Sequence, residues 1–181
     1  MTAEHQICAT LLDMMETTPY TEIKASDLAK RAGVSRSSFY FYFDSVYAVL
    51  DRLENDFIHG ISDDYTTIYK LSMNRSGRIG TKETIRPTIA FVGRNLRQFR
   101  LLSGPNGSPT FQEKLLKRAE SVGAVLYCDG KLSRQEIMLR FNTMAGAQWY
   151  IYRWWSNHEK EVSQEEIIDY VAKLVDGLTF A

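Results

Sequence analysis

The amino-acid sequence predicts an all-α protein, and three observations support this prediction. Apolar residues recur at intervals of three and four along most of the chain, which is the spacing of one helix face. No segment alternates apolar and polar residues as a half-buried strand does. Serine, glycine and proline stand where helices begin and end. With 181 residues, 44% of them hydrophobic, the chain can form one large or two small packed domains.

The first predicted helix carries apolar residues at helical spacing from Ile7 to Met15 and ends at Thr18-Pro19. A short helix over 26–32 follows and ends at Gly33, which can take the left-handed conformation that closes a helix. After Val34, an apolar plug, Ser35 is a strong N-cap for a second helix over 36–42. This order predicts a DNA-binding helix-turn-helix whose second helix enters the major groove.

The polar residues of that second helix are the predicted DNA contacts. Arg36 can bind guanine or a phosphate, and Ser37 and Ser38 can donate to either. The hydroxyls of Tyr40 and Tyr42 suit phosphate contacts. The alternative is an ordinary packing unit, an interpretation that we adopt for four apolar residues. These are Ala29, Val34, Phe39 and Phe43.

The run from Lys24 to Phe43, followed by Ser45 and 48–50, resembles the N-terminal domain of TetR-family transcriptional regulators. Its Ala-Gly-Val-Ser turn and Tyr-x-Tyr-Phe end carry the resemblance. The family usually has a phosphate-binding lysine at the start of the fourth helix, where this chain has Val46. Ser45 can still cap that helix, whose free amides could receive a phosphate oxygen, so Ser45 is also a predicted DNA contact. We expect weaker anchoring at this point but retained binding. The resemblance places the following residues at the DNA surface: Lys24, Ala25, Ser26, Ser35, Arg36, Ser37, Ser38, Tyr40 and Tyr42.

The net charge is formally zero, so a DNA-binding surface must be local. Residues 24–36 hold four basic residues and one acidic residue, a net charge of +3, whereas residues 1–50 hold four basic and six acidic residues. Residues 70–100 hold eight basic residues and one acidic residue. A solvated helix face is the preferred explanation for this second run, and a DNA-facing flank or a pocket for an anionic effector are the alternatives.

Three segments are predicted: a helix-turn-helix domain over 1–45, a long linking helix over 46–73, and a C-terminal regulatory and dimerisation domain over 74–181. Gly77 and Gly80 indicate a loop at the last boundary. Four further helices are expected to begin near Pro87, after Ser108-Pro109, after Ser133 and at the Ser163-x-x-Glu166 capping box; the first of these continues through Phe99.

The last two helices carry more apolar surface than one small domain needs, which suggests association of two chains. A two-fold dimer would also present two recognition helices to a palindromic site. In TetR-like proteins these helices form a four-helix bundle between subunits. The expected interface residues are Met144, Ala147, Ile151, Trp155, Ile167, Val171, Leu174 and Leu178.

TetR-like regulators commonly hold a small molecule in the C-terminal domain, and the resemblance therefore implies an effector pocket. Apolar walls with few polar groups favour a small hydrophobic or aromatic effector over a polar one. Core packing is the alternative for each aromatic residue. The candidate lining residues are Phe91, Phe99, Tyr127, Phe141, Gln148, Trp149 and Tyr152.

The sequence contains no signature of an enzyme, a metal site or a membrane protein. The histidines are isolated, and no phosphate-cradling glycine loop or nucleophile elbow is present, so no enzyme, metal or cofactor is predicted. Cys8 and Cys128 have no close partner and are expected to be buried free thiols. With no run of eighteen apolar residues and no basic leader followed by an apolar stretch, a cytoplasmic location without membrane association is expected.

The sequence thus predicts a homodimeric transcriptional regulator, a repressor that binds a palindromic DNA operator and is released by a small effector. One alternative is a DNA-bound structural or cell-division factor on a TetR-like fold that acts through a protein partner. The other is a ligand-carrying or enzymatic helical protein with a vestigial helix-turn-helix.

Overall fold

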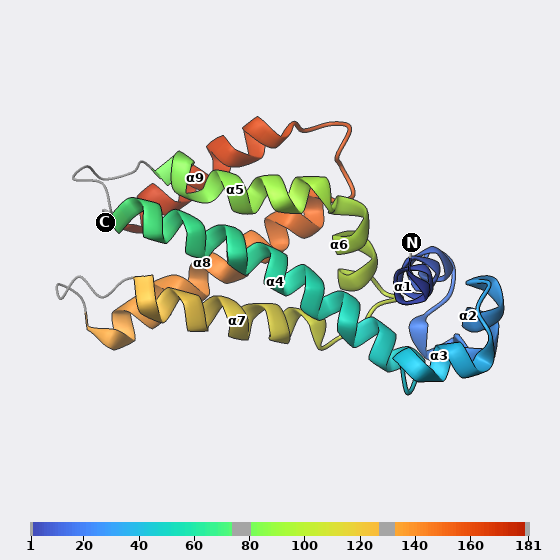
Figure 1. Ribbon diagram of the computed structural model, residues 1–181. Helices are drawn as coiled ribbons and strands as arrows, with labels where there is room; N and C mark the ends of the chain where they lie inside the picture. Colours follow the sequence, from blue (N-terminus) through green and yellow to red (C-terminus); the bar gives the residue numbers. More distant parts are fainter. Residues whose placement is uncertain (1, 74–80, 127–132, 180–181) are drawn as a thin grey trace. The chain divides into compact units, whose positions relative to one another are not determined.

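The computed structural model describes residues 2–73, 81–126 and 133–179 (Figure 1). These residues form helices joined by turns, with no strand among them, which confirms the predicted all-α class. In chain order the helices are α1 (Ala3–Met15), the 3-10 helix η1 (Tyr20–Glu22), α2 (Ala25–Arg31), α3 (Arg36–Tyr42), α4 (Val46–Met73), α5 (Thr81–Arg94), α6 (Leu96–Ser103), α7 (Phe111–Leu126), α8 (Arg134–Trp155) and α9 (Gln164–Thr179).

The helices divide into two compact units. The described residues within 1–57 and 97–111 form the first unit, and those within 58–96 and 112–181 form the second. α4 therefore begins in the first unit and ends in the second, while most of α6 belongs with the N-terminal helices. The predicted segments follow chain order, whereas each unit is assembled from separate parts of the sequence.

The three N-terminal helices are held by buried apolar faces. Ile7 and Leu11 of α1, Leu28 of α2 and Phe39 of α3 are fully buried. Because residues three and four apart share a helix face, each helix turns one apolar stripe inward. α1 contacts both α2 and α3, so removal of these stripes from water holds the three helices in one core.

An aromatic cluster joins α4, α6 and the start of α7 within the first unit. Its members are Phe57, Phe99 and Phe111, all fully buried. The ring centroids of Phe57 lie 5.6 Å from Phe99 and 5.9 Å from Phe111, and Phe99 lies 6.2 Å from Phe111. The tilted and edge-on arrangements are those that aromatic quadrupoles favour. Phe99, which the sequence analysis assigns to an effector pocket, is thus a core residue of the first unit.

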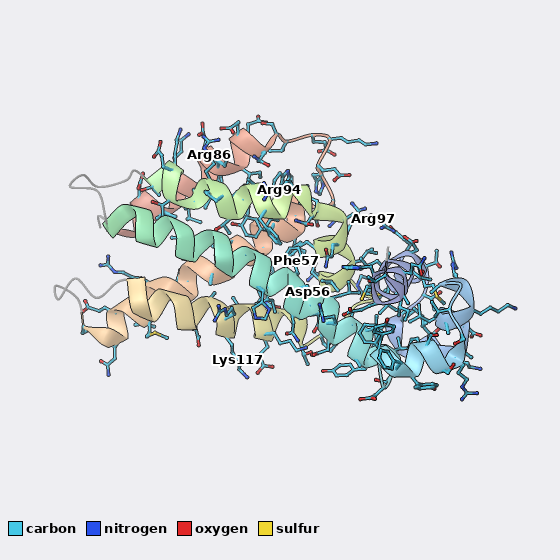
Figure 2. The ribbon with its side chains drawn as sticks, viewed as in Figure 1. Asp56, Phe57, Arg86, Arg94, Arg97 and Lys117 are labelled. Atoms are coloured by element: carbon cyan, nitrogen blue, oxygen red, sulfur yellow. The ribbon has the colours of Figure 1, made fainter. Side chains whose placement is uncertain are left out.

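Polar contacts also tie α6 to α1. The Arg97 guanidinium donates to Asp13 Oδ1 and Glu16 Oε1, each at 2.8 Å, near the C-terminal end of α1 (Figure 2). These hydrogen bonds raise the pKa of Arg97 above its ordinary value. In the turn after α6, Asn106 Nδ2 donates to the Met15 carbonyl at 2.9 Å. The end of α1 therefore finds its hydrogen-bond partners on a segment remote in sequence.

The helix boundaries around Pro87 differ from the prediction. α5 starts at Thr81, so Pro87 lies inside it instead of at its start, at the cost of one backbone hydrogen bond. The predicted single helix through Phe99 is also interrupted, because Asn95 separates α5 from α6. Asn95 Nδ2 donates to the Phe91 carbonyl at 2.8 Å and so occupies an acceptor of the last turn of α5. A side chain thus ends α5 where the apolar spacing shows no break.

In the second unit α5 and α9 lie side by side (Figure 1). Lys82 Nζ lies 2.6 Å from Asp169 Oδ1, and Arg86 pairs with Glu165, so the two helices run in opposite directions. Both pairs are exposed, where such bridges contribute little stability. Three basic side chains of the run over 70–100, those of Lys82, Arg86 and Arg97, thus form ion pairs on helix faces. This agrees with the solvated-face explanation for these three residues.

α4 and α5 approach closely within the second unit at Gly60. A Cβ added at Gly60 would lie 2.2 Å from Cζ of Phe91, so the ring packs directly over the glycine backbone. Any larger residue at this position would have to displace the ring. Phe91, another predicted pocket residue, is half-buried in this contact.

The predicted serine caps of the last two helices are present. Glu136 N donates to Ser133 Oγ at 3.2 Å, and Glu166 N donates to Ser163 Oγ at 3.3 Å. In return each glutamate accepts from the hydroxyl and backbone N–H of its serine, which lowers the pKa of both carboxyl groups. Each pair is a reciprocal capping box.

Cys8 of α1 is a free thiol, as predicted, and is half-buried. Burial, together with the nearby charge of Glu4, raises its pKa to about 11. The thiol therefore stays protonated and weakly nucleophilic near neutral pH. Cys128 lies outside the described residues.

Replacing Phe99 by alanine is expected to destabilise the first unit by about 3–5 kcal/mol, because the change leaves a cavity between two buried rings. The control Leu139→Ala removes an exposed apolar side chain from α8 and is expected to change the free energy of unfolding by less than about 0.5 kcal/mol. Urea denaturation followed by circular dichroism measures both. Equal losses in the two variants would show that the aromatic cluster does not hold the unit.

Candidate nucleic-acid interface

The turn between α2 and α3 has the geometry that the sequence predicts. Gly33 has φ 69°, in the left-handed region that favours glycine, and is the residue just past the end of α2. Its N–H donates to the Lys30 carbonyl at 3.2 Å, and Val34 N–H donates to the Ala29 carbonyl at 3.0 Å. The turn therefore satisfies the last carbonyls of α2 before α3 begins.

Ser35 begins α3 as its N-cap. Its Oγ accepts from Ser38 N–H at 3.0 Å and lies 2.9 Å from both Ser37 Oγ and Ser38 Oγ. One hydroxyl thus orders the first turn of the helix and fixes the neighbouring hydroxyls. Ser35 and Ser37 are exposed and Ser38 is half-buried. These hydroxyl groups form a polar cluster at the beginning of α3.

Burial of Phe39 determines which side of α3 faces water. Phe39 is fully buried and its ring lies 6.3 Å from that of Phe43, which is also buried, as predicted for both. On the exposed side the guanidinium of Arg36 lies 5.6 Å from the ring centroid of Tyr40, a cation–π contact between residues one turn apart. Tyr40 is 45% and Tyr42 42% exposed. The side chains predicted to contact DNA are therefore accessible.

Sequence reasoning missed Phe41, which is 80% exposed. Its ring lies 4.9 Å from the Tyr42 ring in an edge-on arrangement. Residues two before and two after a buried residue point nearly opposite to it in a helix of 3.6 residues per turn. Applied to Phe39, this rule places Ser37 and Phe41 at the centre of the outward face, and it was available from the sequence.

The remaining predicted DNA contacts lie at the starts of α2 and α4. Lys24 and Ser26 are exposed, and Ala25 is half-buried. Ser45 is exposed and caps α4, since its Oγ accepts from Ala48 N–H at 3.1 Å. Val46 is buried, so the position where TetR-like proteins usually have a lysine supplies packing here. All of the predicted DNA-binding residues belong to the first unit.

The structure separates the predicted pocket residues. Phe99 lies in the first unit, in the aromatic cluster. In the second unit Phe91 and Gln148 are half-buried, and Trp149 and Tyr152 are buried. Two side chains lie outside the described set. These are Tyr127 and Phe141.

A groove of about 510 Å³ lies on α8 and α9 within the second unit. Three aromatic residues on it are strongly exposed: Tyr150 by 66%, Tyr170 by 61% and Trp154 by 48%. Clustered exposed apolar side chains are typical of interaction sites. The groove is lined by Tyr150, Ile151, Trp154, Val162, Glu166, Ile167 and Tyr170.

Only part of the predicted dimer interface lies on this groove. Ile151 and Ile167 line it, but of these two only Ile151 is half-buried. Ile167, Trp155 and Val171 are buried within the chain, where a partner subunit would reach little of them. Tyr150 and Trp154 of α8 were missed, because a helix that is apolar all round does not reveal which face its own domain covers. Met144, Ala147 and Leu174 are half-buried, and the side chain of Leu178 lies outside the described set.

Comparison with known proteins identifies the N-terminal domain. Residues 7–53 match the family model for bacterial regulatory proteins of the tetR family. Residues 7–53 therefore form an N-terminal domain of the tetR-family type. The HTH-type transcriptional regulator EthR of Mycolicibacterium smegmatis is 53% identical over 47 residues, which are 26% of this chain and 22% of EthR. The chain spans about a quarter of the length of the curated relatives it matches.

The likeness to solved structures covers the whole fold. A TetR/AcrR-family transcriptional regulator from Thermobifida fusca has 22% identity and a TM-score of 0.60, over 98% of this chain and 97% of that one. FadR from Bacillus subtilis, solved in complex with stearoyl-CoA, has 14% identity and a TM-score of 0.66, over 94% of this chain and 96% of that one. At these identities the likeness establishes the fold.

The described residues were also considered as a possible membrane span and a possible metal site. None of the described helices combines the length and apolar character needed to cross a bilayer. Among the described side chains, no group of three or more histidine, cysteine, aspartate or glutamate residues is placed to hold a metal ion.

Proposed function

We propose that this protein is a cytoplasmic transcriptional regulator of the TetR family that binds a palindromic DNA operator as a homodimer. The exposed face of α3 carries the proposal: a capped helix behind a left-handed glycine turn presents Arg36, Ser37, Tyr40 and Tyr42 to solvent. Guanidinium and hydroxyl groups on a short exposed helix suit base edges and phosphates in a major groove. The match over residues 7–53 supports the same function.

The groove on α8 and α9 supports the homodimer. A dimer is needed because one short helix reads only a few base pairs, and two-fold symmetry presents a second copy. Aromatic side chains with one polar end are favoured at interfaces, and Tyr150, Trp154 and Tyr170 are of this type. We propose that a second copy of the chain covers these three residues.

Repression with release by a small ligand is the proposed mode of regulation. A dimer bound across an operator blocks any machinery that must occupy the same DNA, so repression requires no further contact surface. A fold like this one holds stearoyl-CoA in FadR of Bacillus subtilis. For this chain we propose a small hydrophobic or aromatic effector in the second unit, near the buried Trp149 and Tyr152.

Arg36→Ala is expected to weaken operator binding at least about 30-fold, since a bidentate arginine–guanine contact contributes about 1–3 kcal/mol and the homodimer loses one such contact in each half-site. Fluorescence anisotropy with a duplex selected from random sequences measures the change. Lys117→Ala is the matched control, because it also removes one positive charge but lies on α7 in a pair with Glu113 at 2.7 Å. Equal affinity of Arg36→Ala and the unaltered protein would contradict the assignment of Arg36.

Trp154→Glu is expected to weaken self-association at least about 30-fold, because it puts a charge beside Glu166 in the groove in place of a large aromatic side chain. Sedimentation velocity over a concentration series measures the shift from dimer to monomer. Phe41→Asp, which places a charge at an even more exposed aromatic position of the first unit, is expected to leave association unchanged. An unaltered protein that stays monomeric on its operator would refute the homodimer.

An effector is expected to lower operator affinity about 5- to 150-fold, the usual range of coupling between two sites. Fatty acids, long-chain acyl-CoA and neutral aromatic compounds form the test panel. Ligands that raise the Tm of the free protein are first selected, because binding to the folded state stabilises it. They are then added to the operator complex in the anisotropy assay. If every stabilising ligand left operator affinity unchanged, release by an effector would be refuted.

A further inference from the structure

Phe41 occupies the centre of the proposed DNA-reading face. It lies two residues after the fully buried Phe39, on the opposite side of α3, and Ser37 lies there one turn earlier. Arg36 and Tyr40, joined by their cation–π contact, flank this centre. Phe41 is the most exposed large hydrophobic residue on this face.

Folding of the chain does not account for a phenylalanine at this position. The ring is 80% exposed, the highest exposure among the large hydrophobic residues of the described chain, and it packs edge-on against Tyr42, which is itself 42% exposed. Phenylalanine also has no special helix propensity. A large apolar ring at the centre of an otherwise polar face therefore indicates an apolar group on the molecule that covers it.

The major-groove edges of the base pairs carry one apolar group, the C5-methyl of thymine, and phenylalanine is among the side chains that contact it. We propose that Phe41 reads a thymine methyl in each half-site of the operator. Resting on the proposed function, this inference assigns sequence preference to one residue of the same site. The guanidinium and hydroxyls around the ring favour DNA over an apolar protein partner, because they would meet acceptors on base edges and phosphates.

Replacing thymidine by deoxyuridine tests the contact, because their bases, thymine and uracil, differ only by the C5-methyl group. On an operator selected from random duplexes, each thymine is replaced in turn by deoxyuridine, in both half-sites together. The protein is expected to bind one such duplex about 15-fold more weakly, since burial of one methyl contributes about fourfold in affinity and two half-sites multiply. The other replacements are expected to change affinity by less than about twofold.

The same duplexes are then bound by Phe41→Ala and Phe41→Leu. Phe41→Ala is expected to bind the thymine operator more weakly and to lose the preference for thymine, whereas Phe41→Leu, which keeps an apolar side chain, retains part of it. Circular dichroism is expected to match the unaltered protein, because the replaced ring is exposed. Full preference for thymine in Phe41→Ala would overturn the inference, since another residue would then read the methyl.

The outcomes separate this inference from the proposed function. Selective operator binding without any thymine preference would overturn the role of Phe41 and leave the regulator intact. Failure to select any operator would overturn both. If Phe41→Ala kept operator affinity and preference but lost capture of a protein partner, the ring would be a protein-docking residue, and the inference would likewise fall.

Discussion

Burial of Phe39 is the constraint on which the proposed interface depends. α3 has only seven residues, so its orientation cannot come from a long apolar stripe and rests on this one ring with Phe43 beside it. Once Phe39 is inside, the helical period puts Ser37 and Phe41 outside. The Ser35 cap acts on the same helix from its first turn, because it holds Ser38 N–H and the neighbouring hydroxyls. The Ser35 cap and the burial of Phe39 therefore act together to fix which face of α3 is exposed.

The membership of α6 in the first unit gives the helices of the proposed DNA interface a support that is remote in sequence. Phe99 packs against Phe57 and Phe111, and Arg97 bridges Asp13 and Glu16 near the end of α1. The burial of Phe99 contributes more to this attachment than the exposed ion pairs do. Three short helices have little core of their own, so residues 97–111 complete a domain that the first 57 residues would form incompletely.

Much of the fold was predictable from the sequence, because local rules decide it. Gly33 in the left-handed conformation, the Ser35 cap and the Ser163 capping box all depend on neighbours within a few residues. The break between α5 and α6 was missed, because a side-chain hydrogen bond from Asn95 makes it inside an uninterrupted apolar spacing. At the candidate interface, Arg36 and the tyrosines could be selected from their residue types. Phe41 could not, because its exposure follows from its position opposite Phe39 and not from its residue type.

The sources of DNA affinity in this chain follow from how its charges are used. Val46 is buried where TetR-like proteins usually have a phosphate-binding lysine, and Lys82, Arg86 and Arg97 are held in ion pairs with acidic residues. We therefore expect few phosphates to be neutralised per subunit, so that release of counterions contributes less and binding varies less steeply with salt. The remaining affinity must come from the hydroxyl, guanidinium and apolar contacts that each subunit makes to the bases of its own half-site. Because each of these contributes only a modest factor, simultaneous binding of two copies becomes the condition for selective recognition.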